Sequence, residues 1–193
     1  DAQSLHRALT ANVLSAGRPS AHASQQLDRR DLSDLFRREP AVALAHLHSE
    51  AVAGGSTDLL AALAELSFLH AERGGRPWYL AAALYAYAFL AESSLEASLN
   101  ALDPRFRLAA DLYNLGLSAG LRSDDGEEVL LTPGIRPLPF GSLDLAVDEA
   151  EFLWGGYRMV RFVPVAEFEV RGLRNRYRKS GLGAPLAASL APT

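Results

Sequence analysis

The chain has 193 residues, enough for one ordinary domain or two small ones, because domains usually contain roughly 100–200 residues. Its hydrophobic share of 49% and charged share of 22% are typical of a globular protein, which excludes a disordered or fibrous one. The net charge of −4 excludes a generally basic nucleic-acid binder, and the lack of cysteine excludes disulfides, thiolate zinc sites and a cysteine nucleophile.

Up to about residue 121, apolar residues recur at the spacing of one helix face. Proline and capping residues divide this region, because proline suits the first turn of a helix and not its middle. The pattern predicts about six helices: 5–14, 24–36 with a break at Asp31, 40–53, a helix capped by Ser56 or Thr57 and ending before Gly74, 78–92, and 104–120. The fifth is apolar on nearly every side, so we expect it at the centre of the bundle.

The two helices around Gly74 and Gly75 resemble the helix-turn-helix unit of tetratricopeptide or Sel1-like repeats. Small residues such as Ala81 and Ala82 recur where the two helices would meet. A second copy in register is lacking, whereas a solenoid needs about three repeats to bury its core. The sequence therefore predicts a single hairpin of this kind and not a repeat array.

Beyond Arg122 the period changes from helical to alternating, which is typical of half-buried strands. The expected order is a turn at 123–126, a β-prone run at 128–131, a loop framed by Pro137 and Pro139, a strand over 142–148, a turn at 154–157, and strands over 158–170. Val160 and Phe162 are expected on one face of the last segment, which Pro164 divides or bends because it cannot donate to a ladder. The uncharged end, 181–193, is predicted to be a linker or a cut end.

These patterns together predict an α+β protein, with a helical bundle over 1–121, a small antiparallel β part over 122–180 and the end segment 181–193. The longest apolar stretch, 78–90, has 13 residues, whereas a membrane-spanning helix needs about 20. We therefore expect a buried helix there. The first residues lack the pattern of a signal peptide, which favours a cytoplasmic or an already processed chain, and numbering without an initial Met favours the latter.

The histidines and acids of the sequence do not form a recognisable catalytic or metal-binding set. His46 and His48 are two residues apart, so on a helix they point in different directions and cannot share a metal. His46 and Glu50 have suitable spacing but lack a third ligand, so a solvated helix is the better interpretation. His70 is interpreted as a charge at a helix C-terminus, and no partner is identified for His6 or His22.

The patterns G-x-S-x-G, G-x-x-x-x-G-K-S/T and G-x-G-x-x-G are all absent from the chain. Gly181-Leu182-Gly183 matches the dinucleotide fingerprint only in part. We therefore predict no catalytic residue, no cofactor site and no metal site within these residues.

The strongest local signal is a basic run consisting of Arg171, Arg174, Arg176, Arg178 and Lys179. Residues 158–179 hold seven basic and two acidic side chains, a local charge of +5, so the remainder carries −4 − 5 = −9. The preferred interpretation is pairing with the chain's own acidic helices, for example at Asp28, Asp31, Asp34 and Glu39, or with a neighbouring domain. A solvated face and a ligand site for phosphate or a lipid headgroup remain open alternatives, the latter including peripheral membrane contact. Nucleic acid is not expected as a partner.

Three stretches carry a family resemblance: YLAAALYAY at 79–87, DPRFRLAADLYN at 103–114 and GLRNRYRKSGLGAPL at 172–186. Together they resemble the N-terminal region of large bacterial α/β-hydrolase-like proteins, esterases or lipases of the cell envelope, in which such a region precedes the catalytic sheet. The resemblance covers most of residues 24–187. Two features of the family are missing here, the lipobox cysteine and the nucleophile elbow.

The resemblance implies an accessory segment of a serine hydrolase acting on an ester or lipid-like substrate, with the catalytic residues supplied after residue 193. It also implies a following catalytic domain or second chain as partner, and an envelope or secreted location. The alternative is a non-catalytic interaction module, in which the hairpin around Gly74 and Gly75 forms a groove for a partner peptide.

Overall fold

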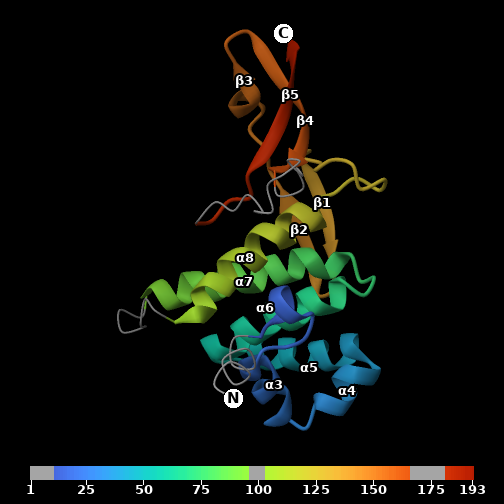
Figure 1. Ribbon diagram of the computed structural model, residues 1–193, viewed down its shortest axis with the longest axis vertical. Coiled ribbons are helices and arrows are strands. Elements are labelled where there is room, and N and C mark those ends of the chain that lie inside the picture. Colours follow the sequence, from blue (N-terminus) through green and yellow to red (C-terminus); the bar gives the residue numbers. More distant parts are fainter. Residues whose placement is uncertain (1–10, 96–102, 166–180) are drawn as a thin grey trace.

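A computed structural model describes residues 11–95, 103–165 and 181–193. Helices fill the first part of the chain and two small antiparallel sheets the second, which confirms the α+β class. Figure 1 shows the helices as a base from which the β part extends, with the C-terminus at the far tip.

Most helices begin and end close to the predicted residues. The described residues contain α2 (Val13–Ala16), α3 (Ala21–Asp28), α4 (Ser33–Arg38), α5 (Pro40–Val52), α6 (Thr57–Ala71), α7 (Pro77–Leu95) and α8 (Pro104–Gly120). The predicted break at Asp31 is confirmed, because this residue has a φ of +54° and separates α3 from α4. The start of the predicted helix 5–14 lies outside the described residues, but the helix is not continuous to residue 14, because Asn12 caps α2. The start predicted near Ser24 is wrong, because the Ser20 hydroxyl accepts from the Ala23 N–H at 3.1 Å and α3 begins at Ala21.

Helix α7 lies between α6 and α8, as predicted for the central helix (Figure 1). Its alanines at 81, 82, 83 and 86 are buried, and α8 presents glycine to it. A Cβ on Gly116 would lie 2.7 Å from the Tyr79 carbonyl oxygen, and one on Gly120 would lie 2.6 Å from Leu80 Cγ. Close contact between these helices therefore requires glycine at both positions. No helix in the described ranges has the length and apolar character to cross a membrane.

The β part consists of two sheets. Strands β1 (Gly134–Leu138) and β2 (Gly141–Leu145) form an antiparallel hairpin. Strands β3 (Leu153–Trp154), β4 (Tyr157–Pro164) and β5 (Leu186–Pro192) form an antiparallel sheet in the order β3-β4-β5, and the short 3-10 helix η1 (Glu149–Phe152) precedes β3. The turn predicted at 154–157 is confirmed as the β3–β4 connection.

Strand β1 lies where a loop was predicted. A two-residue loop joins Leu138 to Gly141, so these two residues form a hydrogen-bonded pair. Because hydrogen-bonded and non-hydrogen-bonded pairs alternate, the nitrogen of the preceding residue, Pro137, points away from β2. The missing donor of this proline therefore costs the ladder nothing. Conversely, the β-prone run at 128–131 makes only an isolated bridge at Val129, whose N–H donates to the Phe162 carbonyl at 2.8 Å.

Strand β5 corrects the prediction that 181–193 is a linker or a cut end. Residues 186–192 pair with β4 along its whole length. Asn114 on α8 fixes the turn before the strand: its Nδ2 donates to the Gly181 carbonyl at 2.9 Å, and its Oδ1 accepts from the Gly183 N–H at 2.8 Å. The prediction failed because alanine and serine have weak strand preference and the pairing partner is distant in sequence.

Candidate functional site

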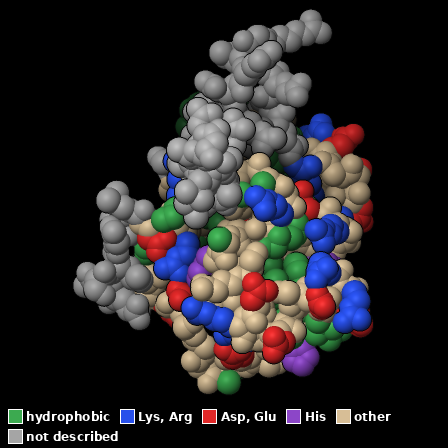
Figure 2. All heavy atoms as spheres, turned by 60° about the horizontal axis from the view of Figure 1, so that its bottom comes forward, with side chains coloured by type: hydrophobic (Ala, Val, Ile, Leu, Met, Phe, Trp, Pro, Cys, Tyr) green, Lys and Arg blue, Asp and Glu red, His purple; other side chains and the backbone are tan. Residues whose placement is uncertain are grey.

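The predicted basic site, Arg171, Arg174, Arg176, Arg178 and Lys179, lies outside the described residues, so its interpretations stay predictions. Two of the acids suggested as partners have local contacts: Asp34 pairs with Arg37, and Asp28 accepts from the Ser33 hydroxyl. Figure 2 shows acidic and basic side chains interspersed over the helical end of the molecule. This end is therefore a surface of mixed charge and not a field of one sign.

Two arginines at the start of the basic segment are described, and both pair with acids of the β part. Arg158 lies 3.3 Å from Glu149, and Arg161 lies 2.9 Å from Glu127. These ion pairs are exposed, so each contributes little stability. Both pairs lie outside the run from Arg171 to Lys179, so they do not test its interpretations.

The histidines of α5 point in different directions, as predicted, but only His46 is exposed. His48 is half-buried, so the interpretation as a solvated helix, which was made for His46 and Glu50, does not extend to it. Its ring stacks on Phe140 with 4.2 Å between centroids, and the Tyr85 hydroxyl lies 2.8 Å from its Nδ1. Burial lowers the pKa of His48, which favours the neutral ring over the charged one.

Aromatic contacts continue from this point across the base of the β part. Phe140, in the β1–β2 turn, also meets Trp78 edge-on at 5.3 Å, and Trp78 meets His70 at 5.2 Å. Burial and the charge of Arg73 lower the pKa of His70, which works against a charge at this helix end. The cluster holds the hairpin on the helices.

Within the described part of the chain, no three His, Asp or Glu side chains are grouped so as to hold a metal ion.

A buried carboxylate that the sequence analysis missed lies on α6. Glu65 is 1% exposed. Its Oε1 accepts from the N–H groups of Val13 at 3.0 Å and Ser20 at 2.9 Å, and its Oε2 accepts from the Ser20 hydroxyl at 2.6 Å. Burial raises the pKa of Glu65, and these hydrogen bonds oppose the shift. The signal in the sequence is a single charge inside the apolar run of 59–69.

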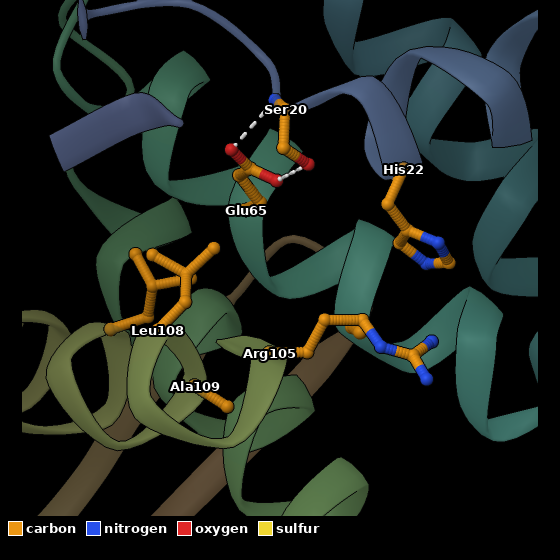
Figure 3. A pocket seen from close by; sticks show the side chains of 8 residues that line it. Ser20, His22, Glu65, Arg105, Leu108 and Ala109 are labelled. Atoms are coloured by element: carbon orange, nitrogen blue, oxygen red, sulfur yellow. Dashed lines mark hydrogen bonds between the residues drawn. The ribbon is translucent and has the colours of Figure 1, made fainter. Parts of the chain in front are cut away.

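A small pocket of about 20 Å³ adjoins this carboxylate, the space of about one water molecule. Figure 3 shows the ring of His22 and the guanidinium of Arg105 on one side of it, away from the Glu65–Ser20 pair. The His22 Nε2 lies 2.9 Å from the Asp58 carbonyl oxygen. Arg105 pairs with Asp58 and, at 2.6 Å, with Asp103.

This arrangement is not that of an activated serine. Nucleophilic catalysis needs a base that takes the hydroxyl proton and a third group that orients the base. The Ser20 hydroxyl instead donates to a carboxylate that two main-chain N–H groups already occupy, and it caps α3 as well. The imidazole of His22 is engaged with a main-chain carbonyl. The cluster therefore ties the segment before α3 to the core.

The β3–β4–β5 sheet carries the most exposed apolar surface of the β part. Cross-strand partners share a face of a sheet, so the pairs Trp154–Tyr157, Tyr157–Pro192 and Met159–Leu190 lie on one side. We call these five residues the outer apolar face. Trp154 is 67% exposed, Tyr157 46% and Leu190 45%.

Nearer the helices, the same side of the sheet is covered. Phe162 contacts Phe152 at 5.0 Å, and Phe162 and Leu186 pack on a second small core formed by Leu80, Leu121 and Val129. The opposite side carries Arg158 and Arg161. A bulge between Met159 and Arg161 leaves Val160 exposed, so the expectation that Val160 shares a face with Phe162 is wrong.

Comparison of the chain with protein-family models, curated proteins and solved structures gives no match.

Proposed function

We propose that this chain is a non-catalytic accessory segment that braces a serine hydrolase of the α/β type, whose substrate is an ester or lipid-like molecule. The catalytic serine, histidine and acid lie outside these residues, on the same protein or on a second chain. The nature of the partner rests on the resemblance of 79–87, 103–114 and 172–186 to such proteins. An envelope location rests on the same resemblance.

The outer apolar face is the observation that carries the proposal. Apolar residues scattered singly are ordinary on a protein surface, whereas apolar residues gathered on one face often mark an interface. Tryptophan and tyrosine are enriched at the centres of interfaces. Trp154 and Tyr157 are paired across the tight β3–β4 turn, so the fold holds them in place before any partner binds.

The helical hairpin is less suited to this role. Helices α6 and α7 pack against each other and against α8, and most of α6 is buried. The residues that would line a peptide groove thus form the core of the bundle. An interaction module built on this hairpin stays a prediction, and the exposed surface favours the sheet instead.

The first test is the complete reading frame that encodes the chain, together with its neighbours. We expect a G-x-S-x-G motif on a predicted strand-to-helix turn within the same protein or an adjacent one. If no such motif exists, or if the purified chain alone hydrolyses short-chain esters, the proposal is wrong.

The second test measures docking. Trp154 is exposed whereas Trp78 is only 8% exposed, so in a Trp78→Phe background the fluorescence reports on the outer apolar face. Adding the hydrolase unit should shift this emission to the blue. Trp154→Ala should weaken binding at least about 30-fold, the effect of a residue worth about 2 kcal/mol.

Tyr87→Ala is the matched control, since Tyr87 is 52% exposed on α7, outside the sheet. It should leave the affinity unchanged. Equal losses from both substitutions would contradict docking through the outer apolar face.

A further inference from the structure

Apart from the proline at its last residue, the outer edge of β5 lacks the features that normally prevent strands from pairing with another chain. Among the described residues, the strand order β3-β4-β5 leaves β5 with one paired edge. Natural edge strands are protected by lysine and other charges, by proline, by inward-pointing charges, by bulges or by a covering helix or loop. Strand β5 reads LAASLAP, without a charge, and its proline is the last residue.

Two hydrogen bonds identify the main-chain groups that point outward. The Val165 N–H donates to the Pro185 carbonyl at 3.0 Å, and the Thr193 N–H donates to the Gly156 carbonyl at 3.2 Å. Hydrogen-bonded and non-hydrogen-bonded pairs alternate along an antiparallel ladder. Counting from either bond, the main-chain groups that point to β4 belong to Ala187, Ser189 and Ala191. The N–H and C=O groups of Ala188 and Leu190 point outward.

The side chains of β5 suit a second copy of the same strand. If a two-fold axis passes through Ser189, then Leu190 of one copy lies opposite Ala188 of the other, a large residue against a small one on one face. On the other face, Ala187 lies opposite Ala191. A charged residue near the axis would meet a like charge from its own copy, and β5 has none.

We propose that two copies of this chain associate by antiparallel pairing of their β5 strands about Ser189. The two three-stranded sheets become one six-stranded sheet. Because the strands run in opposite directions, the helical bundles lie at opposite ends of it, as the position of β5 beyond the helices allows (Figure 1). This pairing uses main-chain groups at the edge and does not depend on the proposed function, which uses the face of the sheet.

A proline substitution tests the main-chain groups of β5 that point outward. Ala188→Pro removes an outward donor and leaves the bonds to β4 intact, so we expect a folded monomer by sedimentation over a wide concentration range. Ala188→Val keeps the donor and should dimerise like the unmodified chain. Trp154→Ala should also leave the dimer unchanged, which separates this proposal from docking through the outer apolar face.

A cysteine pair tests the register, because the chain has no cysteine of its own. Ser189→Cys places the two thiols directly opposite, at a non-hydrogen-bonded pair with about 4.5 Å between Cα atoms, which a disulfide can span. Ala187→Cys is the matched control, since its two copies would be four residues out of register.

We expect rapid oxidation to a covalent dimer for Ser189→Cys and not for Ala187→Cys. A chain that is monomeric at every concentration, or a dimer that Ala188→Pro leaves intact, overturns the proposal. Equal cross-linking of the two cysteine variants overturns the two-fold axis at Ser189.

Discussion

Replacing Glu65 tests how the bundle holds the segment before α3. In Glu65→Ala, the N–H groups of Val13 and Ser20 and the Ser20 hydroxyl lose their common acceptor. Each buried donor left without a partner costs about 1–2 kcal/mol, so the three together cost about 3–6 kcal/mol. This is a large part of the stability of an ordinary domain, which is about 5–15 kcal/mol.

Glu65→Gln is the finer change, because it keeps one oxygen for the two main-chain donors and replaces the acceptor of the Ser20 hydroxyl with an amide. We expect it to cost about 1 kcal/mol near neutral pH. Burial raises the pKa of Glu65 above its ordinary 4.5, so the folded state holds this proton more tightly than the unfolded state. The contribution of Glu65 is therefore complete below about pH 4.5 and is lost as the pH rises through the folded pKa.

The assay is urea unfolding of the unmodified chain and of Glu65→Gln at a series of pH values from 4 to 8, a range chosen to span about three units above the ordinary pKa. The difference in free energy of unfolding should be largest at the acid end and should shrink as the pH rises. A difference that grows with pH would refute the reasoning, because it would mean that the three donors outweigh burial and lower the pKa.

Three further changes have definite expected outcomes. Gly116→Ala should destabilise the chain by about 1–3 kcal/mol, since its Cβ would lie 2.7 Å from the Tyr79 carbonyl oxygen, and a stabilised variant would show that α8 moves away freely. Asp103→Ala should cost about 0.5–2 kcal/mol as a lost N-cap, and since Arg105 lowers the pKa of Asp103, the cost should disappear as the pH falls well below 3.8. Phe140→Ala should uncover His48, whose lowered pKa should return toward 6.5 in an NMR titration, and an unchanged pKa would contradict the stacking.

The helices were predictable because their signals are local. Pro40, Pro77 and Pro104 each stand at the first position of a helix, and α7 is apolar on nearly every side because neighbours cover it on two. Within the described residues, the start of α3 at Ser20 was misplaced and the boundary at Asn12, inside the predicted helix 5–14, was missed. These depend on which of several polar residues bonds to a nearby N–H, and composition alone does not decide that.

The sheets and the candidate surface were less predictable because their partners are distant. The turn between Trp154 and Tyr157 was recognised, but not that both side chains stay exposed. That depends on β5, whose residues have little strand preference and pair because Asn114 holds the turn before them. Glu65 was overlooked because a charge in an apolar helix face has meaning only when its donors, 45 and 52 residues away, are known.

The two bonds of Asn114 bear on the order of folding. Strands β4 and β5 are joined by a connection that leaves Pro164 and returns at Leu186, and closing a loop costs more entropy as it lengthens. Asn114 provides a fixed attachment for the returning chain only after α8 has formed. We therefore expect the β4–β5 ladder to form after the helices and to open before them, so its amides should exchange with solvent deuterium sooner than those of α7. Asn114→Ala should hasten that exchange in β5 while leaving the amides of α7 protected.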